Sequence, residues 1–248
     1  MSGAAQGGNR MNYPFDLGLW SRNISTESAA AQRWFDRGLN WTYGYNHEEA
    51  VVCFRNAVEA DPDCAMAWWG IAYAAGPFYN RPWIRFTEAE IAETLPVCHE
   101  AVQRAVSLAA AAAPSERALI EALTKRYQNP DERGHEILTD WQWQFADAMA
   151  DVYRAHQDDP DVAALYAEAA VTCTPRQLWD LKTGEANPQS RTAEIMPTLD
   201  HWIDRIERVG PAHPGILHMC IHALEMSPFP QRALKAADML RGLAPDAG

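Results

Sequence analysis

Two histidines and a glutamate near the end of the chain have types and spacing that suit metal binding. In the segment "AHPGILHMCIHALEMSP", His218 and His222 are four residues apart, and Glu225 follows three residues later. In a helix, which turns by about 100° per residue, these three side chains project from one face. Two imidazoles and a carboxylate can hold a divalent ion such as Zn²⁺ or Fe²⁺. His213 precedes the expected helix and could reach back, so the sequence predicts a metal site of His218, His222, Glu225 and His213.

The same histidines also have a purely structural interpretation. Pairs of histidines four apart arise by chance, and helix histidines commonly make hydrogen bonds across a packed groove. The segment differs from the zinc-protease motif H-E-x-x-H, because Met219 stands where the catalytic glutamate would be. A mononuclear site would therefore need a ligand from elsewhere or a water. Metal binding and polar packing, or hydrogen bonding to a ligand, both stay open.

A second group of candidate residues lies in the first half of the chain. The stretch "GPFYNRPW" offers Asn80 and Arg81 as hydrogen-bond donors, and Tyr79 and Trp83 as apolar walls. It is interpreted either as a binding loop or as a plug of aromatic packing. His47 is expected at the first turn between two helices, either as an ordinary surface residue or as a polar group facing the same groove.

Hydrophobic residues recur at three- and four-residue spacing along nearly the whole chain, which predicts α-helices. These helices must position the candidate side chains. We find no convincing alternation with period two, so the fold class expected is all-α. About ten helices are predicted, over residues 28–45, 47–60, 63–75, 88–112, 115–127, 135–157, 161–173, 191–209, 214–226 and 230–243.

The first two predicted helices carry the offsets of a tetratricopeptide repeat. Large, small and aromatic residues alternate at fixed positions and a proline ends the unit, as shown by Trp34, Gly38, Trp41, Ala50, Phe54, Ala57 and Pro62. Small residues let two antiparallel helices approach closely, and the proline suits the start of the next helix. Similar prolines recur at Pro114, Pro160, Pro214 and Pro245. The pattern predicts an α-solenoid of tetratricopeptide-like antiparallel helix pairs.

The tetratricopeptide resemblance implies a location for a binding groove. In such arrays the first helix of each pair lines the concave face, which implies that Phe35, Leu39, Trp69 and Tyr73 face a ligand. Family members that grip a chaperone's carboxylate use Lys, Asn and Arg where this chain has Phe35 and Leu39. A co-chaperone role is therefore not expected.

Two longer stretches are similar to stand-alone tetratricopeptide-repeat proteins of bacteria and fungi. They are "FDRGLNWTYGYNHEEAVVCFRNAVEADPDCAMAWWGIAYAAGP" and "HPGILHMCIHALEMSPFPQRALKAADMLRGLAP". The resemblance implies an all-helical array but no particular activity. In that family the "LAPDAG" segment leads into another histidine-rich helix, so this chain looks C-terminally truncated relative to its members. A homodimer that covers helix 230–243 is the alternative expectation.

Composition excludes several partners and suggests a compartment. The formal charge is −12, and no basic stripe is present, which disfavours nucleic acid. No apolar run reaches the roughly 20 residues that a membrane span needs. Five scattered cysteines without a C-x-x-C pair suggest free thiols in a reducing compartment, so a cytoplasmic location is expected. Residues 1–26 are expected to be a flexible leader, and 27–248 the repeat domain.

The function expected from these features is that of a helical-repeat binding protein, whose concave groove holds a partner peptide or a small ligand. The alternative is a metal-dependent enzyme or a small-molecule-binding protein centred on His218, His222 and Glu225. The sequence does not complete a catalytic set, so it leaves open whether the protein is an enzyme.

Overall fold

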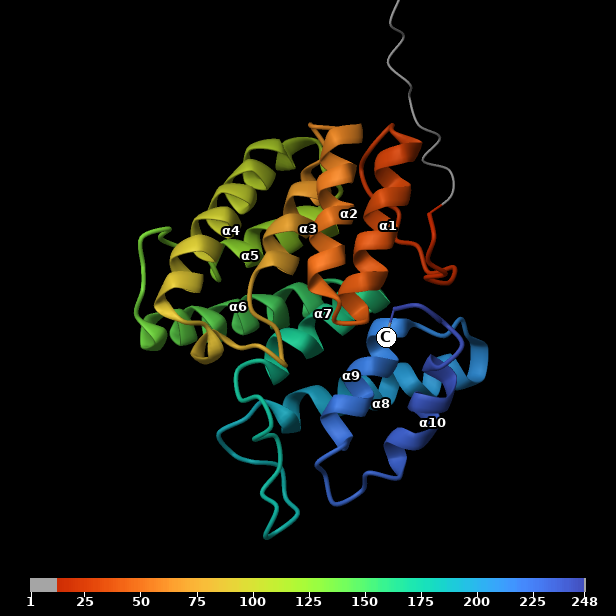
Figure 1. Cartoon of the computed structure of the whole chain (residues 1–248). Helices are drawn as coiled ribbons and strands as arrows, with labels where there is room; N and C mark the ends of the chain where they lie inside the picture. The colour runs from red at the N-terminus through yellow and green to blue at the C-terminus, as the bar shows by residue number, and fades with distance from the viewer. Residues whose placement is uncertain (1–12, 248) are drawn as a thin grey trace, which may run out of the picture.

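The computed structural model describes residues 13–247, and this part of the chain is built from α-helices (Figure 1). Two isolated β-bridges occur between 13 and 247, but no sheet forms there. The all-α prediction is therefore confirmed. The ten helices are Ala29–Tyr43 (α1), His47–Ala60 (α2), Ala65–Ala75 (α3), Glu88–Leu108 (α4), Pro114–Thr124 (α5), His135–Ala155 (α6), Pro160–Val171 (α7), Thr192–Val209 (α8), Pro214–Leu224 (α9) and Arg232–Leu240 (α10).

Helix boundaries agree with the sequence prediction to within a few residues because local signals set them. Pro114, Pro160 and Pro214 each occupy the first residue of a helix, where a missing N–H group costs no hydrogen bond. Pro62 instead lies in the turn before α3, which begins at Ala65. None of the helices described is long and apolar enough to cross a membrane.

Helices α1, α2 and α3 pack closely around one aromatic ring. A Cβ atom added to Gly38 would lie 2.7 Å from the ring of Phe54, and one added to Gly70 would lie 2.4 Å from it. Both distances are too short for real carbon atoms. The Phe54 ring therefore fills a space that exists because α1 and α3 each present a glycine to it. This is the role the repeat pattern predicts for its small and large residues.

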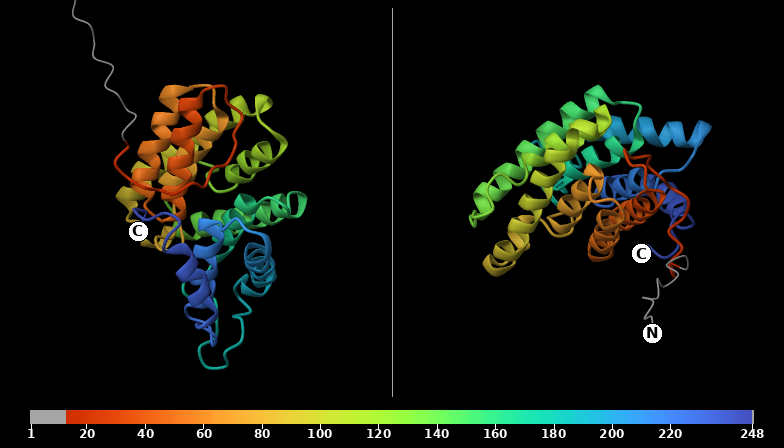
Figure 2. Two further views of the ribbon diagram at one scale, coloured as in Figure 1. Left: turned by 90° about the vertical axis from the view of Figure 1, so that its right-hand side faces the viewer. Right: turned by 90° about the horizontal axis from the view of Figure 1, so that it is seen from above.

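The later helices extend this packing and bring distant segments together. Helix α7 contacts α6, α8 and α9, and almost all of its residues are buried. Helices α8, α9 and α10 form the end of the molecule opposite α1–α5 (Figures 1 and 2). Helix α9 also contacts α1. An open solenoid has contacts only between neighbouring repeats, so the solenoid arrangement itself stays a prediction.

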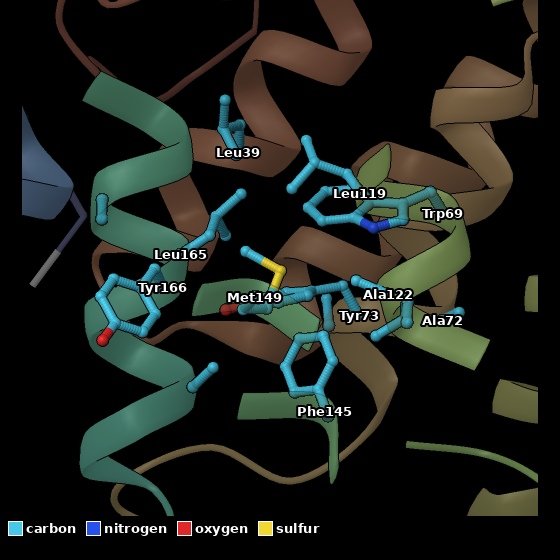
Figure 3. Close-up of a cluster of buried hydrophobic side chains, with 14 of the residues drawn as sticks. Leu39, Trp69, Ala72, Tyr73, Leu119, Ala122, Phe145, Met149, Leu165 and Tyr166 are labelled. Carbon is cyan, nitrogen blue, oxygen red and sulfur yellow. The ribbon is translucent and has the colours of Figure 1, made fainter. Parts of the chain in front are cut away.

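The residues expected to line a concave groove are part of the hydrophobic core, which corrects the groove prediction. Phe35, Leu39, Trp69 and Tyr73 are each at most 2% exposed. Figure 3 shows Leu39, Trp69 and Tyr73 among side chains of α5, α6 and α7, including Leu119, Phe145, Met149 and Leu165. The tetratricopeptide resemblance placed these residues on the inner face of their helices, and that face is buried. The resemblance could not show that α5–α7 cover that face.

The predicted leader is ordered over its second half, whereas residues 1–12 lie outside the described residues. Leu17 and Ile24 are buried, and the Arg22 guanidinium donates to Asp159 at 2.8 Å. The Trp20 indole N–H donates to Asp161 at 2.9 Å. Residues 20–22 are therefore held against the start of α7, because the polar side chains of Trp20 and Arg22 find partners there.

Helix α10 keeps one large apolar side chain on the surface. Leu234 is 64% exposed, while Met239 is half-buried against α9. The predicted homodimer would cover this exposed apolar surface of α10. The dimer stays a prediction, since a single chain does not test it.

Candidate functional site

Four rings from distant parts of the sequence meet beside α9. The Tyr45 ring centroid lies 5.8, 4.4 and 5.2 Å from those of His47, His218 and His222, and the two α9 histidines are 4.6 Å apart. We name Tyr45, His47, His218 and His222 the histidine–tyrosine cluster. It joins residues of the α1–α2 turn with residues of α9.

Two aromatic residues of the loop after α3 flank this cluster. The Phe78 ring stacks on His47 with the centroids 4.0 Å apart. The Tyr79 ring lies 4.7 Å from that of His222. The loop 76–83, predicted to be either a binding loop or an aromatic plug, therefore brings Tyr79 to the α9 histidine His222.

A tight turn aims the Tyr45 side chain into the cluster. Tyr45 has φ = 60°, which is uncommon for a residue other than glycine. The turn is held by a hydrogen bond from the Asn46 N–H to the Trp41 carbonyl at 3.0 Å. Arg176 is the other non-glycine residue in 13–247 with positive φ, and its N–H donates to the Tyr79 hydroxyl at 3.3 Å. Such backbone conformations are enriched at functional sites. Tyr45 belongs to the cluster, and Arg176 contacts Tyr79 beside it.

Each cluster histidine is oriented by a hydrogen bond from Nδ1. The Nδ1–H group of His47 donates to the Ala74 carbonyl at 3.0 Å, and that of His218 donates to the Tyr43 carbonyl at 2.5 Å. The Nδ1–H group of His222 donates to Oε1 of Glu225 at 2.8 Å. In a neutral ring, Nε2 then carries the lone pair. Within the described residues, Nε2 of His47 and of His222 are buried without a partner.

Burial keeps two of these rings uncharged. Desolvation lowers the pKa of His47 to about 4, against the opposing effect of its bond to the Ala74 carbonyl. Desolvation and the neighbouring His222 lower the pKa of His218 to about 4 as well. Both imidazoles are neutral at pH 7 and present a hydrogen-bond acceptor.

A small internal cavity adjoins the cluster. It has about 10 Å³ of free space, which corresponds to roughly one water molecule, and its walls include Tyr45, His47 and Met219. Glu168 also lines it and accepts hydrogen bonds from the Tyr73 hydroxyl and the Thr172 hydroxyl, both at 2.8 Å. No sequence motif pointed to Glu168, because its hydrogen-bond partners come from packing around it.

Two larger openings reach the cluster from the surface. We name the first the outer pocket; its volume is about 540 Å³, and it lies between α1, α9, α10 and the segment 244–247, with His218 in its wall. The second is a groove of about 650 Å³ lined by Tyr45, His47 and Phe78, among others. His218 therefore borders one opening and Tyr45 and His47 border the other, whereas His222 lines neither.

The structure does not assemble the predicted four-residue metal site. His213 is 1% exposed and belongs to a different network, because its Nε2 donates to Asp161 at 3.1 Å and its Nδ1 accepts from the Ile216 N–H. It caps α9 instead of reaching the α9 histidines. Glu225 orients His222. Across residues 13–247, no three His, Cys, Asp or Glu side chains are arranged to hold a metal.

The remaining loop candidates act mostly in packing. Tyr79 and Trp83 are 1% and 2% exposed, so they form the aromatic plug rather than the walls of an open site. Asn80 accepts from the Arg176 guanidinium at 3.2 Å, and Arg81 pairs with Glu90 at 2.8 Å. Only Tyr79 also contacts the cluster.

Comparisons with known proteins add no family to this description. No family model matches the chain, and no curated protein matches its sequence. The resemblance to stand-alone tetratricopeptide-repeat proteins therefore stays a prediction, based on the residue offsets of its two quoted stretches.

Proposed function

We propose that this chain is a small-molecule-binding protein, whose ligand contacts the histidine–tyrosine cluster. The observation that carries the proposal is that three histidines are fixed through Nδ1, while their Nε2 atoms have no hydrogen-bond partner among residues 13–247, and two of these nitrogens are buried. A buried acceptor without a partner costs roughly 1–3 kcal/mol of stability. Such a cost is reasonable where a ligand supplies the missing donor.

This proposal follows the second of the two functional hypotheses rather than the first. The peptide-groove hypothesis rests on Phe35, Leu39, Trp69 and Tyr73, and these side chains are enclosed by other helices. His218 of α9, in contrast, lines a pocket of the size of small-molecule sites, which is about 300–1,000 Å³, and the His222 ring lies 4.6 Å from that of His218. The surface available near the cluster suits a compact ligand.

A divalent metal is the second candidate ligand, favoured by the orientation of the histidines. Metal-binding imidazoles usually donate their other N–H group to a carbonyl or carboxylate, as His218 and His222 do here. Two histidines supply only part of a coordination sphere, so water or the small molecule must supply the rest. The groups present would favour Zn²⁺ or Fe²⁺.

One set of variants tests both candidates. A fragment library is screened by ligand-observed NMR, and Zn²⁺ is titrated by calorimetry, against the wild type, His222→Phe and His201→Phe. His201 is exposed on α8 and serves as the matched control. We expect fragment binding that His222→Phe weakens at least five-fold and His201→Phe leaves unchanged.

His222→Phe is also expected to fold normally. It removes a buried unpaired nitrogen, and the released Glu225 carboxylate is 42% exposed and returns to water. Thermal unfolding of the variant checks this point. Binding of no fragment by the folded wild-type protein contradicts small-molecule binding, and Zn²⁺ affinity that is equal in all three proteins contradicts the metal candidate.

A further inference from the structure

We infer that the outer pocket takes an apolar small molecule that carries a neutral N–H or O–H donor, and that this donor bonds to His218. The inference rests on the proposed function and gives its ligand a chemical class. It depends on the walls of the pocket, on the polar atoms left without partners there, and on the charge at its rim.

The walls of the outer pocket are mainly apolar. They come from α9, α10 and the segment after α10, and include Pro214, Ile221, Ala237, Leu240, Ala244 and Pro245. A volume of about 540 Å³ is enough for a small organic molecule. Apolar walls stabilise an apolar ligand body, because its surface leaves water on binding.

The first polar group in the wall is the His218 imidazole. Its Nδ1–H group is occupied by the Tyr43 carbonyl at 2.5 Å, so Nε2 is the ring nitrogen left for a ligand. A lone pair on that nitrogen accepts a hydrogen bond and cannot donate one. A ligand that meets His218 therefore needs a donor.

The second polar group is the Asn40 side chain, whose unpaired atom is also a hydrogen-bond acceptor. Its Nδ2 donates to the carbonyls of Trp20 at 2.9 Å and Asp36 at 2.8 Å, which fixes the amide orientation. Its Oδ1 has no partner among the described residues, and Asn40 is 3% exposed. The unpaired polar atoms of His218 and Asn40 are thus acceptors, although Oδ1 of Asn40 is buried behind the pocket surface. The hydroxyl of Tyr43, which also lines the pocket, already donates to Asp161 at 2.6 Å.

The charge at the rim decides between a neutral donor and an ammonium group. Arg241 lines the pocket, and its guanidinium donates to the exposed Asp238 at 2.9 Å. This ion pair is close to neutral, and no described Asp or Glu side chain lines the pocket. An ammonium group would therefore lose its hydration there without gaining an opposite charge, which costs far more than the burial of a neutral donor. Indoles, phenols and secondary amides have the required neutral donor on an apolar body.

The test compares indole with 1-methylindole, which has nearly the same apolar surface but no N–H group. Dissociation constants are measured by NMR titration for the full chain, for His218→Phe and for the control His201→Phe. Phe keeps a ring in place of His218 but removes the acceptor. We expect the wild type and the control to bind indole roughly ten-fold more tightly than 1-methylindole, because a donor-less ligand leaves a buried acceptor unpaired.

His218→Phe is expected to bind both probes with similar affinity. Circular dichroism tests whether this variant is folded. If it is unfolded, His218→Gln replaces it; because Gln can donate as well as accept, we expect a smaller difference in affinity between indole and 1-methylindole. Equal affinity of the wild type for the two probes overturns the inference while leaving small-molecule binding intact. Binding of neither probe also overturns it, and the fragment screen then decides separately on the proposed function.

Discussion

At the residue scale, the cluster histidines link ligand chemistry to the stability of the fold. His47 and His218 are neutral in the folded protein because burial lowers their pKa to about 4. In the unfolded chain a histidine has a pKa near 6.5. The unfolded state therefore binds more protons than the folded state between about pH 6.5 and pH 4. As the pH falls through that range, the free energy of unfolding decreases, so the folded state becomes less stable.

This difference predicts how stability changes with pH. We expect the free energy of unfolding from urea titrations to be insensitive to these two groups above about pH 7. It should then fall by up to about 3 kcal/mol per histidine on going to pH 4. The double variant His47→Phe/His218→Phe should show a flatter profile over the same interval, because neither side chain can take up a proton.

Another group separates the effect of the histidines from general acid unfolding. The pKa of Asp161 lies well below its usual range; burial opposes this, but the hydrogen bonds from His213 and Tyr43 and the charge of Arg22 outweigh it. Its stabilising contribution is thus present above about pH 4 and lost only at lower pH. Equal slopes for wild type and double variant between pH 6.5 and 4 would contradict neutral burial of the histidines.

At the element scale, the packing of α1, α2 and α3 depends on glycines at the contact with Phe54. Gly38 and Gly70 approach this ring more closely than any side chain could. Phe54 is 1% exposed and belongs to the core, so the ring has little room to move. The turn that carries Tyr45 and His47 joins α1 to α2, and hence the site depends on this contact.

Gly70→Ala is therefore expected to destabilise the protein, although alanine favours helix formation by roughly 1 kcal/mol. A Cβ atom 2.4 Å from Cδ1 of Phe54 forces a shift, and overpacking of a core typically costs about 1–3 kcal/mol. Urea unfolding measures the change. Adding Phe54→Leu to Gly70→Ala should recover part of the loss, since the smaller side chain leaves space for the methyl group.

Gly242→Ala is the matched control, because a Cβ atom there meets nothing within 4 Å. Its free energy of unfolding should stay within about 0.5 kcal/mol of the wild type. A Gly70→Ala protein as stable as the wild type would show that the close contact is not a constraint on the fold.

At the scale of the whole molecule, one buried carboxylate joins segments from the beginning, middle and end of the chain. Asp161 at the start of α7 accepts from the Tyr43 hydroxyl at 2.6 Å, from Trp20 at 2.9 Å and from His213 at 3.1 Å. Arg22 also pairs with it at 3.2 Å. These bonds fix α9 against α1 and α7, and so hold the α9 histidines opposite Tyr45 and His47.

Asp161→Asn is expected to lower the free energy of unfolding by about 3 kcal/mol, because it leaves buried donors and the Arg22 charge poorly compensated. Hydrogen exchange should also show faster opening of residues 13–26 and of α9 together. Asp158→Asn is the control, since Asp158 is 96% exposed and pairs with Arg205 at the surface. A loss of less than 1 kcal/mol, with exchange unchanged, would rule out this role for the network.

The sequence alone determined the helices and the residues at which they begin and end. Periodicity, capping residues and prolines at the first helical position act within a few residues of each other, so they are visible without a structure. The same local geometry placed His218 and His222 on one face of α9. Small residues opposite Phe54 could likewise be predicted, because the repeat offsets specify which residues of neighbouring helices meet.

The neighbour that each helix face meets follows from tertiary packing and could not be predicted from the sequence. A helical period fixes a side chain's direction about its own helix axis but not the neighbour on that side. Phe35 and Trp69 are therefore core residues, and His213 bonds to Asp161. Tyr45 lies beside His47 and the α9 histidine His218. The burial that keeps His47 neutral arises in the same way, since desolvation depends on every segment packed around a group, however distant in sequence.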